Sequence, residues 1–329
     1  MSGVRQGLLA LAKLAFSVIL LVLLFRRISL EQVMAVVSEA NPMWLAAAAT
    51  MMLASNLLGS YQWGTLLRAV DIHIPFWKVG AYYHIGLFFN NFLPANIGGD
   101  IARIADSSRY GPTTAAAVSA VLMDRLIGTV ALAGLALVTT LPAANRFHLM
   151  LLYLAVVGFF LLSVALLWGV FHPALVPACA RLLQRVGLGR LAPHVADLAL
   201  RLEGFRGRRV LMVRMVALAT LTQLLRIGVH ALVARALHVS VPLPYFFLFV
   251  PLLAVIVSLP ISLNGLGVRE GAGVVLFGLI GVDRAHAFSL QFLTYLVAVA
   301  VSLLGGLAYL LRIPRRRAEA RSLRRNAWR

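Results

Sequence analysis

The fold of this chain is decided by the stretch LPANIGGDIAR at residues 93–103, which interrupts an apolar region with one proline and two adjacent glycines. Proline removes a backbone donor and disrupts a helix, and glycine permits backbone conformations that other residues resist. A second stretch, LPISLNGLGVRE at residues 259–270, repeats the same order: Leu-Pro, an asparagine, two glycines and an arginine beside a carboxylate. Similarity over so few positions also arises by chance, so the repeat needs support from the rest of the chain.

The amino-acid composition indicates that the chain containing both breaks is a membrane protein. Of the 329 residues, 61% are hydrophobic and 12% are charged, whereas soluble domains are about half apolar and about a quarter charged. A membrane-spanning helix needs about 20 mostly apolar residues. The sequence therefore predicts an all-α polytopic helix bundle with six full spans, at residues 7–25, 43–67, 113–141, 149–171, 211–238 and 286–311. The broken regions 76–109 and 245–282 complete a set of eight hydrophobic segments.

The basic residues are unevenly distributed along the chain. The net charge is +19, and the excess lies mainly in residues 181–214 and in the tail from residue 312 to residue 329. Lysine and arginine collect in the cytoplasmic loops of membrane proteins, so we interpret both stretches as topology signals rather than as a nucleic-acid surface. We expect a multi-pass protein of the bacterial inner (cytoplasmic) membrane with both termini in the cytoplasm.

These orientations constrain the two broken regions. If the loop 172–210 and the tail are cytoplasmic, region 76–109 begins and ends inside, and region 245–282 begins and ends outside. Each then fits a re-entrant hairpin, and the two halves of the chain form an inverted repeat, as in many transporters. We predict one transmembrane domain over 1–312, with halves 1–145 and 146–312, and a basic tail over 313–329. The alternative is eight ordinary helices, two of them kinked at proline.

The breaks carry groups that suit an anion. A helix that restarts after Gly98-Gly99 or after Gly267 presents free N–H groups and a partial positive charge. Arg103 and Arg269 add guanidinium groups, which bind phosphate in a forked geometry. We predict that these two arginines approach one central polar cavity from opposite faces and together hold an anionic headgroup.

Carboxylates are expected to offset part of this charge. Asp100 and Glu270 lie beside the two arginines in sequence and would partly neutralise them when the site is empty. Asp124, Arg125 and Arg226 lie within predicted spans, where charged side chains are costly and usually face the bundle interior. Asp124 neutralises one of the arginines in this interpretation, or the group is purely structural. The predicted substrate-binding set is Asn91, Gly98, Gly99, Asp100, Arg103, Asp124, Arg125, Arg226, Asn264, Gly267, Arg269 and Glu270.

Other polar and small residues have simpler interpretations. Asp106 and Arg109 follow the first break at three-residue spacing, which favours a solvated ion pair on a cytoplasmic helix. Small residues let helices approach closely in membranes, which is how we interpret Gly128, Gly134, Gly158, Gly305 and Gly306.

The sequence contains no motif for catalysis. A Walker loop, an HExxH motif and a G-x-S-x-G motif are all missing from it, so we expect no enzymatic activity and no cofactor. The histidines show no metal-ligand spacing, and one cysteine, Cys179, provides neither an internal disulfide nor a metal cluster.

At the two breaks and at one span, the chain resembles the lysylphosphatidylglycerol synthase transmembrane-region family, also called flippase-like. The matching stretches are NNFLP at 90–94 followed by Gly98-Gly99-Asp100 and Arg103, Asp124-Arg125 with Gly128, and Leu259-Pro260 followed by GLGVRE at 265–270. The resemblance implies that the matched residues are functional: Gly98, Gly99, Asp100, Arg103, Asp124, Arg125, Gly267, Arg269 and Glu270.

The family includes the membrane part of bifunctional enzymes that make and flip aminoacylated phosphatidylglycerol. This chain continues only briefly after its last predicted span, so we expect the flippase-like part without the aminoacyl-transferase domain. Stand-alone relatives are linked to hopanoid, glycolipid and polyprenyl pathways, so the resemblance implies a phospholipid, polyprenyl or glycolipid substrate.

Three functions remain open at this point. The first is a transporter of an anionic lipid or lipid-linked phosphate headgroup. The second is a non-transporting accessory subunit of a membrane glycosyltransferase or lipid-modifying enzyme, which would form a stable complex with that enzyme and move no lipid alone. The third is an integral lipid-modifying enzyme. Charged residues within the membrane near the breaks favour the first.

Overall fold

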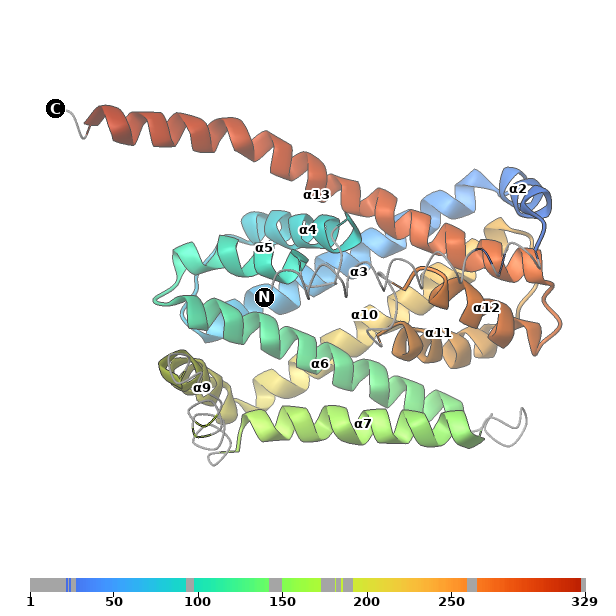
Figure 1. The fold of residues 1–329 in the computed structure, drawn as a ribbon, viewed down its shortest axis with the longest axis horizontal. Coiled ribbons are helices and arrows are strands. Elements are labelled where there is room, and N and C mark those ends of the chain that lie inside the picture. Colours follow the sequence, from blue (N-terminus) through green and yellow to red (C-terminus); the bar gives the residue numbers. More distant parts are fainter. Residues whose placement is uncertain are drawn as a thin grey trace.

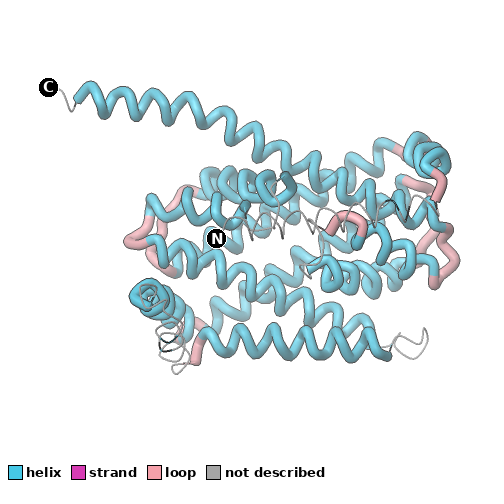
Figure 2. Tube along the Cα trace, viewed as in Figure 1, coloured by secondary structure: helices cyan, strands magenta, loops and turns pink. Residues whose placement is uncertain are grey.

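The computed structural model describes Val22, Leu24, residues 28–92, 98–141 and 150–172, Arg181, Arg185, and residues 192–258 and 265–326. Every regular element in these parts of the chain is a helix (Figure 2). Most of the predicted first span, both break-forming prolines, Asn264 and Cys179 lie outside the described residues.

Within the part of the chain that the structure describes, five helices are long and apolar enough to cross a membrane. They are α3 (Pro42–Ala69), α6 (Thr114–Thr140), α7 (Met150–Val170), α10 (Arg209–Ala236) and α13 (Arg284–Asn326). Their positions match five of the six full spans predicted from the sequence. The backbone of α13 stays helical well past Arg312 and extends beyond the bundle (Figure 1), so the described part of the basic tail continues the last helix.

Each of the two broken regions contains a pair of shorter helices. Region 76–109 contains α4 (Phe76–Phe92) and α5 (Gly98–Ser107), and a 3₁₀ turn follows at Ser108–Tyr110. Region 245–282 contains α11 (Leu243–Ser258) and α12 (Val268–Gly278). The two members of each pair pack on one another. Figure 1 shows the α4/α5 pair in one half of the bundle and the α11/α12 pair in the opposite half.

Glycine makes both pairs possible. A Cβ atom added to Gly99 of α5 would overlap the carbonyl oxygen of Gly86 on α4, so these two helices approach at a point where only hydrogen fits. In the second region the chain enters α12 through Gly265 and Gly267, at φ +78° and +80°, a backbone conformation that glycine adopts without strain.

The remaining helices enclose these pairs. The most extensive helix contact joins α3 to α10, and α10 also packs on α6, α11 and α13. The short helices α2 (Leu30–Ser38) and α9 (Ala192–Arg206) pack on α13 and α6, respectively. Buried apolar side chains form one large cluster around Phe249 and Phe277 and another around Trp63 and Met215.

The predicted packing glycines divide into two groups. A Cβ atom on Gly305 would overlap backbone atoms of His84, and one on Gly306 would contact the ring of Phe88, so both let α13 approach α4 closely, as predicted. Gly134 makes only an ordinary contact with Phe160. The prediction is wrong for Gly128 and Gly158, because a Cβ atom at either position would meet no atom within 4 Å.

Candidate functional site

One cavity of about 530 Å³ collects side chains from both broken regions. The first region contributes Arg103 on α5 together with residues of α4, and the second contributes Arg269 on α12 together with residues of α11. The spans α3, α6, α10 and α13 supply the remaining wall. The structure thus places the two arginines singled out by the sequence on the wall of one cavity.

Arg103 is held tightly in the cavity wall. Its side chain is 7% exposed, and its Nη2 atom lies 2.6 Å from Oδ2 of Asp124 on α6. The guanidinium group also lies over the rings of Trp63 and Tyr83, 4.5 and 4.9 Å from their centroids. The second oxygen of Asp124 accepts a hydrogen bond of 2.9 Å from Gln62 Nε2. These contacts hold the guanidinium group from three other helices, α3, α4 and α6.

Asp100 pairs more closely with Arg125 than with Arg103, the partner that the sequence predicted. Arg125 donates to both of its oxygens, with an Nε–Oδ2 distance of 2.9 Å and an Nη2–Oδ1 distance of 3.0 Å. Asp100 approaches Arg103 only to 3.6 Å. The main carboxylate partner of Arg103 is therefore Asp124, because α5 turns Asp100 toward Arg125 on α6. Two ion pairs between the same helices result.

On the opposite wall, Arg269 lies over the ring of Tyr295, 4.5 Å from its centroid. The neighbouring Glu270 is 1% exposed, and its Oε2 atom accepts a 2.7 Å hydrogen bond from the backbone N–H of Gly267. Glu270 thus caps the start of α12 beside Arg269.

This capping corrects the prediction for two amides after the breaks, those of Gly99 and Gly267, which are not free to bind an anion. The Gly267 N–H donates to Glu270, and the Gly99 N–H donates to Asn90 Oδ1 over 2.9 Å. Side chains of the protein occupy both amides, in the manner of helix N-caps. Any anion in the cavity would therefore be held mainly by arginine side chains.

The predicted set falls into three groups. Six members line the cavity: Asn91, Arg103, Asp124, Arg125, Arg226 and Arg269. Five described members lie outside its wall and support it from behind or cap a helix: Gly98, Gly99, Asp100, Gly267 and Glu270. Asn264 lies outside the described residues.

Several neutral polar side chains in the wall were missed by the sequence analysis. They include Asn56, Gln62, Gln223, Gln291 and Thr294. All lie inside predicted spans, and amide side chains in a membrane helix usually face other helices, because lipid offers them no hydrogen-bond partner. An amide side chain within an apolar span is therefore the feature of the sequence that identifies these residues as facing other helices. Gly128 also lines the cavity, which explains the open space beside it.

Asp106 differs from its predicted role as a solvated partner of Arg109. It is 6% exposed, and its Oδ2 atom lies 2.5 Å from Nη1 of Arg312 at the end of the α13 span. The Arg312 guanidinium also lies over the ring of Tyr82, 4.8 Å from its centroid. The pair joins α5 to α13, which short-range spacing along the chain does not reveal.

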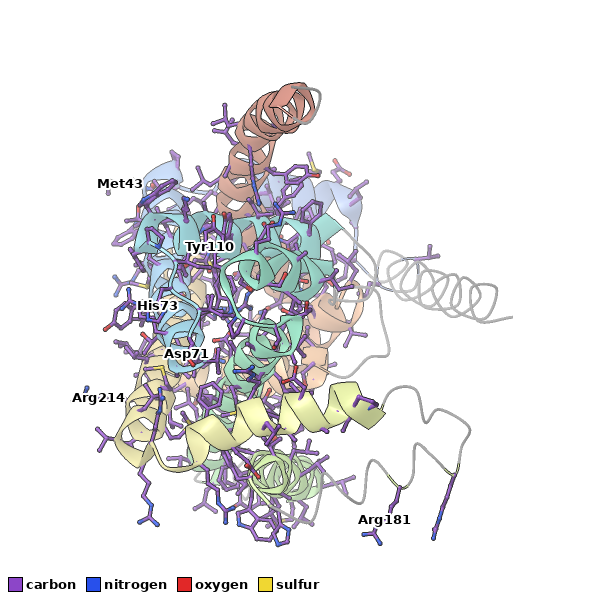
Figure 3. The ribbon with its side chains drawn as sticks, turned by 90° about the vertical axis from the view of Figure 1, so that its left-hand side faces the viewer. Met43, Asp71, His73, Tyr110, Arg181 and Arg214 are labelled. Atoms are coloured by element: carbon purple, nitrogen blue, oxygen red, sulfur yellow. The ribbon has the colours of Figure 1, made fainter. Side chains whose placement is uncertain are left out.

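By contrast, Arg181 and Arg214 of the basic loop region lie on the periphery and point away from the bundle (Figure 3). Both are exposed. They therefore form part of the outer surface and not of the cavity, as a topology signal requires.

The family model described as the lysylphosphatidylglycerol synthase TM region matches residues 10–306. The match contains the described cavity residues and both broken regions. A search of the curated proteins finds no match to the chain.

Proposed function

This chain belongs to the lysylphosphatidylglycerol synthase TM-region family, and on that premise we propose that it is a flippase-like membrane transporter of an anionic lipid or lipid-linked phosphate headgroup. The observation that carries the proposal is the cavity of about 530 Å³ lined by four arginines. Small-molecule sites commonly have volumes of about 300–1,000 Å³. This volume suits a polar headgroup, whose acyl or prenyl chains would remain in the surrounding lipid.

In this proposal the two helix pairs are re-entrant hairpins of an inverted repeat. The helices α5 and α12 have 10 and 11 residues, well short of the roughly 20 that a membrane crossing needs. The pairs lie in opposite halves of the bundle (Figure 1), which supports entry from opposite sides of the membrane. Transporters with this architecture bind their substrates where the broken segments meet, and one repeat moves against the other.

The proposed mechanism is binding and movement without chemical change of the lipid. An arriving headgroup exchanges its water for the guanidinium groups of the wall, and its tails stay in the bilayer. Rearrangement of one hairpin against the long spans would then open the cavity to the other leaflet. We propose no catalytic step.

Topology gives the first test. We expect a cysteine at Gly207, between α9 and α10, to face the cytoplasm, and one at Glu39, after α2, to face the opposite side. Both positions are exposed, and a side chain at Gly207 meets no atom within 4 Å. With Cys179 replaced, an impermeant thiol reagent should label only the Glu39 variant in intact spheroplasts and both variants after permeabilisation. Labelling of the Gly207 variant in intact spheroplasts would refute the orientation.

Lipid binding and movement test the proposal itself. Mass spectrometry of gently purified protein should reveal a co-purifying anionic lipid, and the protein should move that lipid between leaflets of liposomes. Arg269→Ala should weaken binding by about 10- to 100-fold, because hydrogen bonds to charged groups contribute about 1.5–3 kcal/mol. Arg269→Lys should weaken it less, since it keeps the charge and loses only the planar fork.

Arg214→Ala is the matched control, because Arg214 lies on the periphery (Figure 3). It should bind and move the lipid like the unmodified protein. If folded Arg269→Ala protein moves lipid at the unmodified rate, or if the unmodified protein moves none and instead copurifies with a membrane enzyme, the transporter proposal is wrong and an accessory role is favoured.

A further inference from the structure

The charges around the cavity do not cancel. Four arginines line it, at positions 103, 125, 226 and 269. Among the described residues, three carboxylates lie in or directly behind the wall: Asp124, Asp100 and Glu270. The neighbouring segments 93–97 and 259–264 add no charged residue by sequence. Counted without the His230 imidazole, these groups leave one positive charge in excess.

Two of the four arginines form ion pairs with carboxylates on a neighbouring helix. Arg103 is paired with Asp124, and Arg125 is paired with Asp100. Arg269 is followed directly by the buried Glu270. Arg226, on α10, makes no ion pair with any residue in the part of the chain that the structure describes. A charge within a membrane span is costly unless it is paired or solvated, so an anion beside Arg226 would be stabilised.

The helix that carries Arg226 presents a suitable polar surface. Gln223, Arg226 and His230 are separated by three and four residues, which places them on one face of α10, and all three line the cavity. His230 Nδ1 lies 2.9 Å from the carbonyl oxygen of Arg226, so that nitrogen carries its proton and donates to the carbonyl. The face thus combines one full positive charge with neutral polar groups.

We propose that Arg226 binds the phosphate of an anionic phosphodiester headgroup, and that this cavity selects a single negative charge over a double one. The inference rests on the proposed function and specifies its substrate class. A phosphodiester carries one negative charge at pH 7 and presents two free oxygens to the guanidinium fork. A phosphomonoester carries about −1.5 to −2, and a diphosphate carries more. Their further charge would remain uncompensated in a wall already neutralised elsewhere.

The experiment measures binding of three lipid probes to the purified full-length protein, and the two phospholipid probes carry identical short acyl chains. Short-chain phosphatidylglycerol is the diester probe, short-chain phosphatidic acid is the monoester, and farnesyl diphosphate represents lipid-linked diphosphates. The diester should bind at least about tenfold more tightly than the other two. Arg226→Ala should weaken diester binding by about 10- to 100-fold, and Arg226→Gln, which keeps most of the side-chain volume, should weaken it similarly.

Arg235→Ala supplies the control on the same helix. Arg235 is exposed and lies over the Trp44 ring, 5.2 Å from its centroid, away from the cavity wall. Its loss should leave the affinity for every probe unchanged.

The outcomes separate the two proposals. If phosphatidic acid or the diphosphate binds as tightly as the diester, the charge-matching inference is overturned and the transporter proposal stands. If the two Arg226 variants bind the diester normally while Arg269→Ala loses it, the phosphate does not lie at Arg226. If the unmodified protein binds none of the probes and moves no lipid, the proposed function itself fails, and this inference with it.

Discussion

Replacing Asp124 by alanine is expected to destabilise the protein by about 3–5 kcal/mol. The side chains of Asp124 and Arg103 are 11% and 7% exposed, and they are joined by a 2.6 Å contact. Without Asp124, the arginine stays buried between Trp63 and Tyr83 with its charge poorly compensated, because Asp100 is engaged by the fork of Arg125. Removing one partner of a buried pair costs far more than the pair contributes as a whole.

Unfolding by sodium dodecyl sulfate in mixed micelles measures this effect. Asp124→Asn keeps the shape of the side chain and one hydrogen-bonding oxygen, so we expect it to reduce the free energy of unfolding less than alanine does. Arg125→Ala is the comparison on the adjacent residue. The Arg125 side chain is 48% exposed, and exposed ion pairs contribute about 0–1 kcal/mol. If Asp124→Ala and Arg125→Ala reduce the free energy of unfolding by the same amount, burial of the ion pair does not determine how much its loss destabilises the protein.

A second large effect is expected at the contact between α13 and α4. Gly305→Ala places a Cβ atom against backbone atoms of His84, and a helix backbone cannot move aside as a flexible side chain can. Inserting a methyl group into such a contact typically costs about 1–3 kcal/mol. To relieve the overlap, α4 and α13 must move apart as whole helices. Because α4 carries Tyr83 and Asn91 of the cavity wall, lipid binding should weaken as well.

Gly158→Ala on α7 is the matched control, because its Cβ atom meets nothing within 4 Å. In a helix this change should be neutral or slightly stabilising, since alanine favours the helix over glycine by about 1 kcal/mol. Thermal unfolding in detergent, followed by circular dichroism, compares the two variants. If both unfold at the same temperature, the α13/α4 contact has more freedom than the structure indicates.

Local chemistry determined much of what the sequence predicted. Five long spans are set by runs of apolar residues, because a helix in lipid must satisfy its backbone internally and cover it with apolar side chains. The broken regions are set by proline and glycine, which act on the backbone wherever they occur. The proposed binding of an anion at Arg103, Arg226 and Arg269 follows from the charge of the residues themselves.

Tertiary structure alone decided how those charges are paired. Asp100 and Arg103 lie three residues apart, yet each has its closest partner on α6, because the rotation of α5 about its axis brings them against Asp124 and Arg125. Asp106 likewise pairs with Arg312, more than two hundred residues away in the chain. Sequence spacing constrains neighbours on one helix, but partners on different helices depend on how those helices rotate and cross.

The cavity is also a property of the assembled helices. Its wall draws on α3, α4, α5, α6, α10, α11, α12 and α13, and no single segment contains enough of it to be recognised. The sequence by itself determined a membrane bundle with two broken regions and buried arginines, since those follow from residue type and local order. Packing decided which amides are capped and which arginines form ion pairs with carboxylates on other helices, because both depend on distances between segments far apart in the chain.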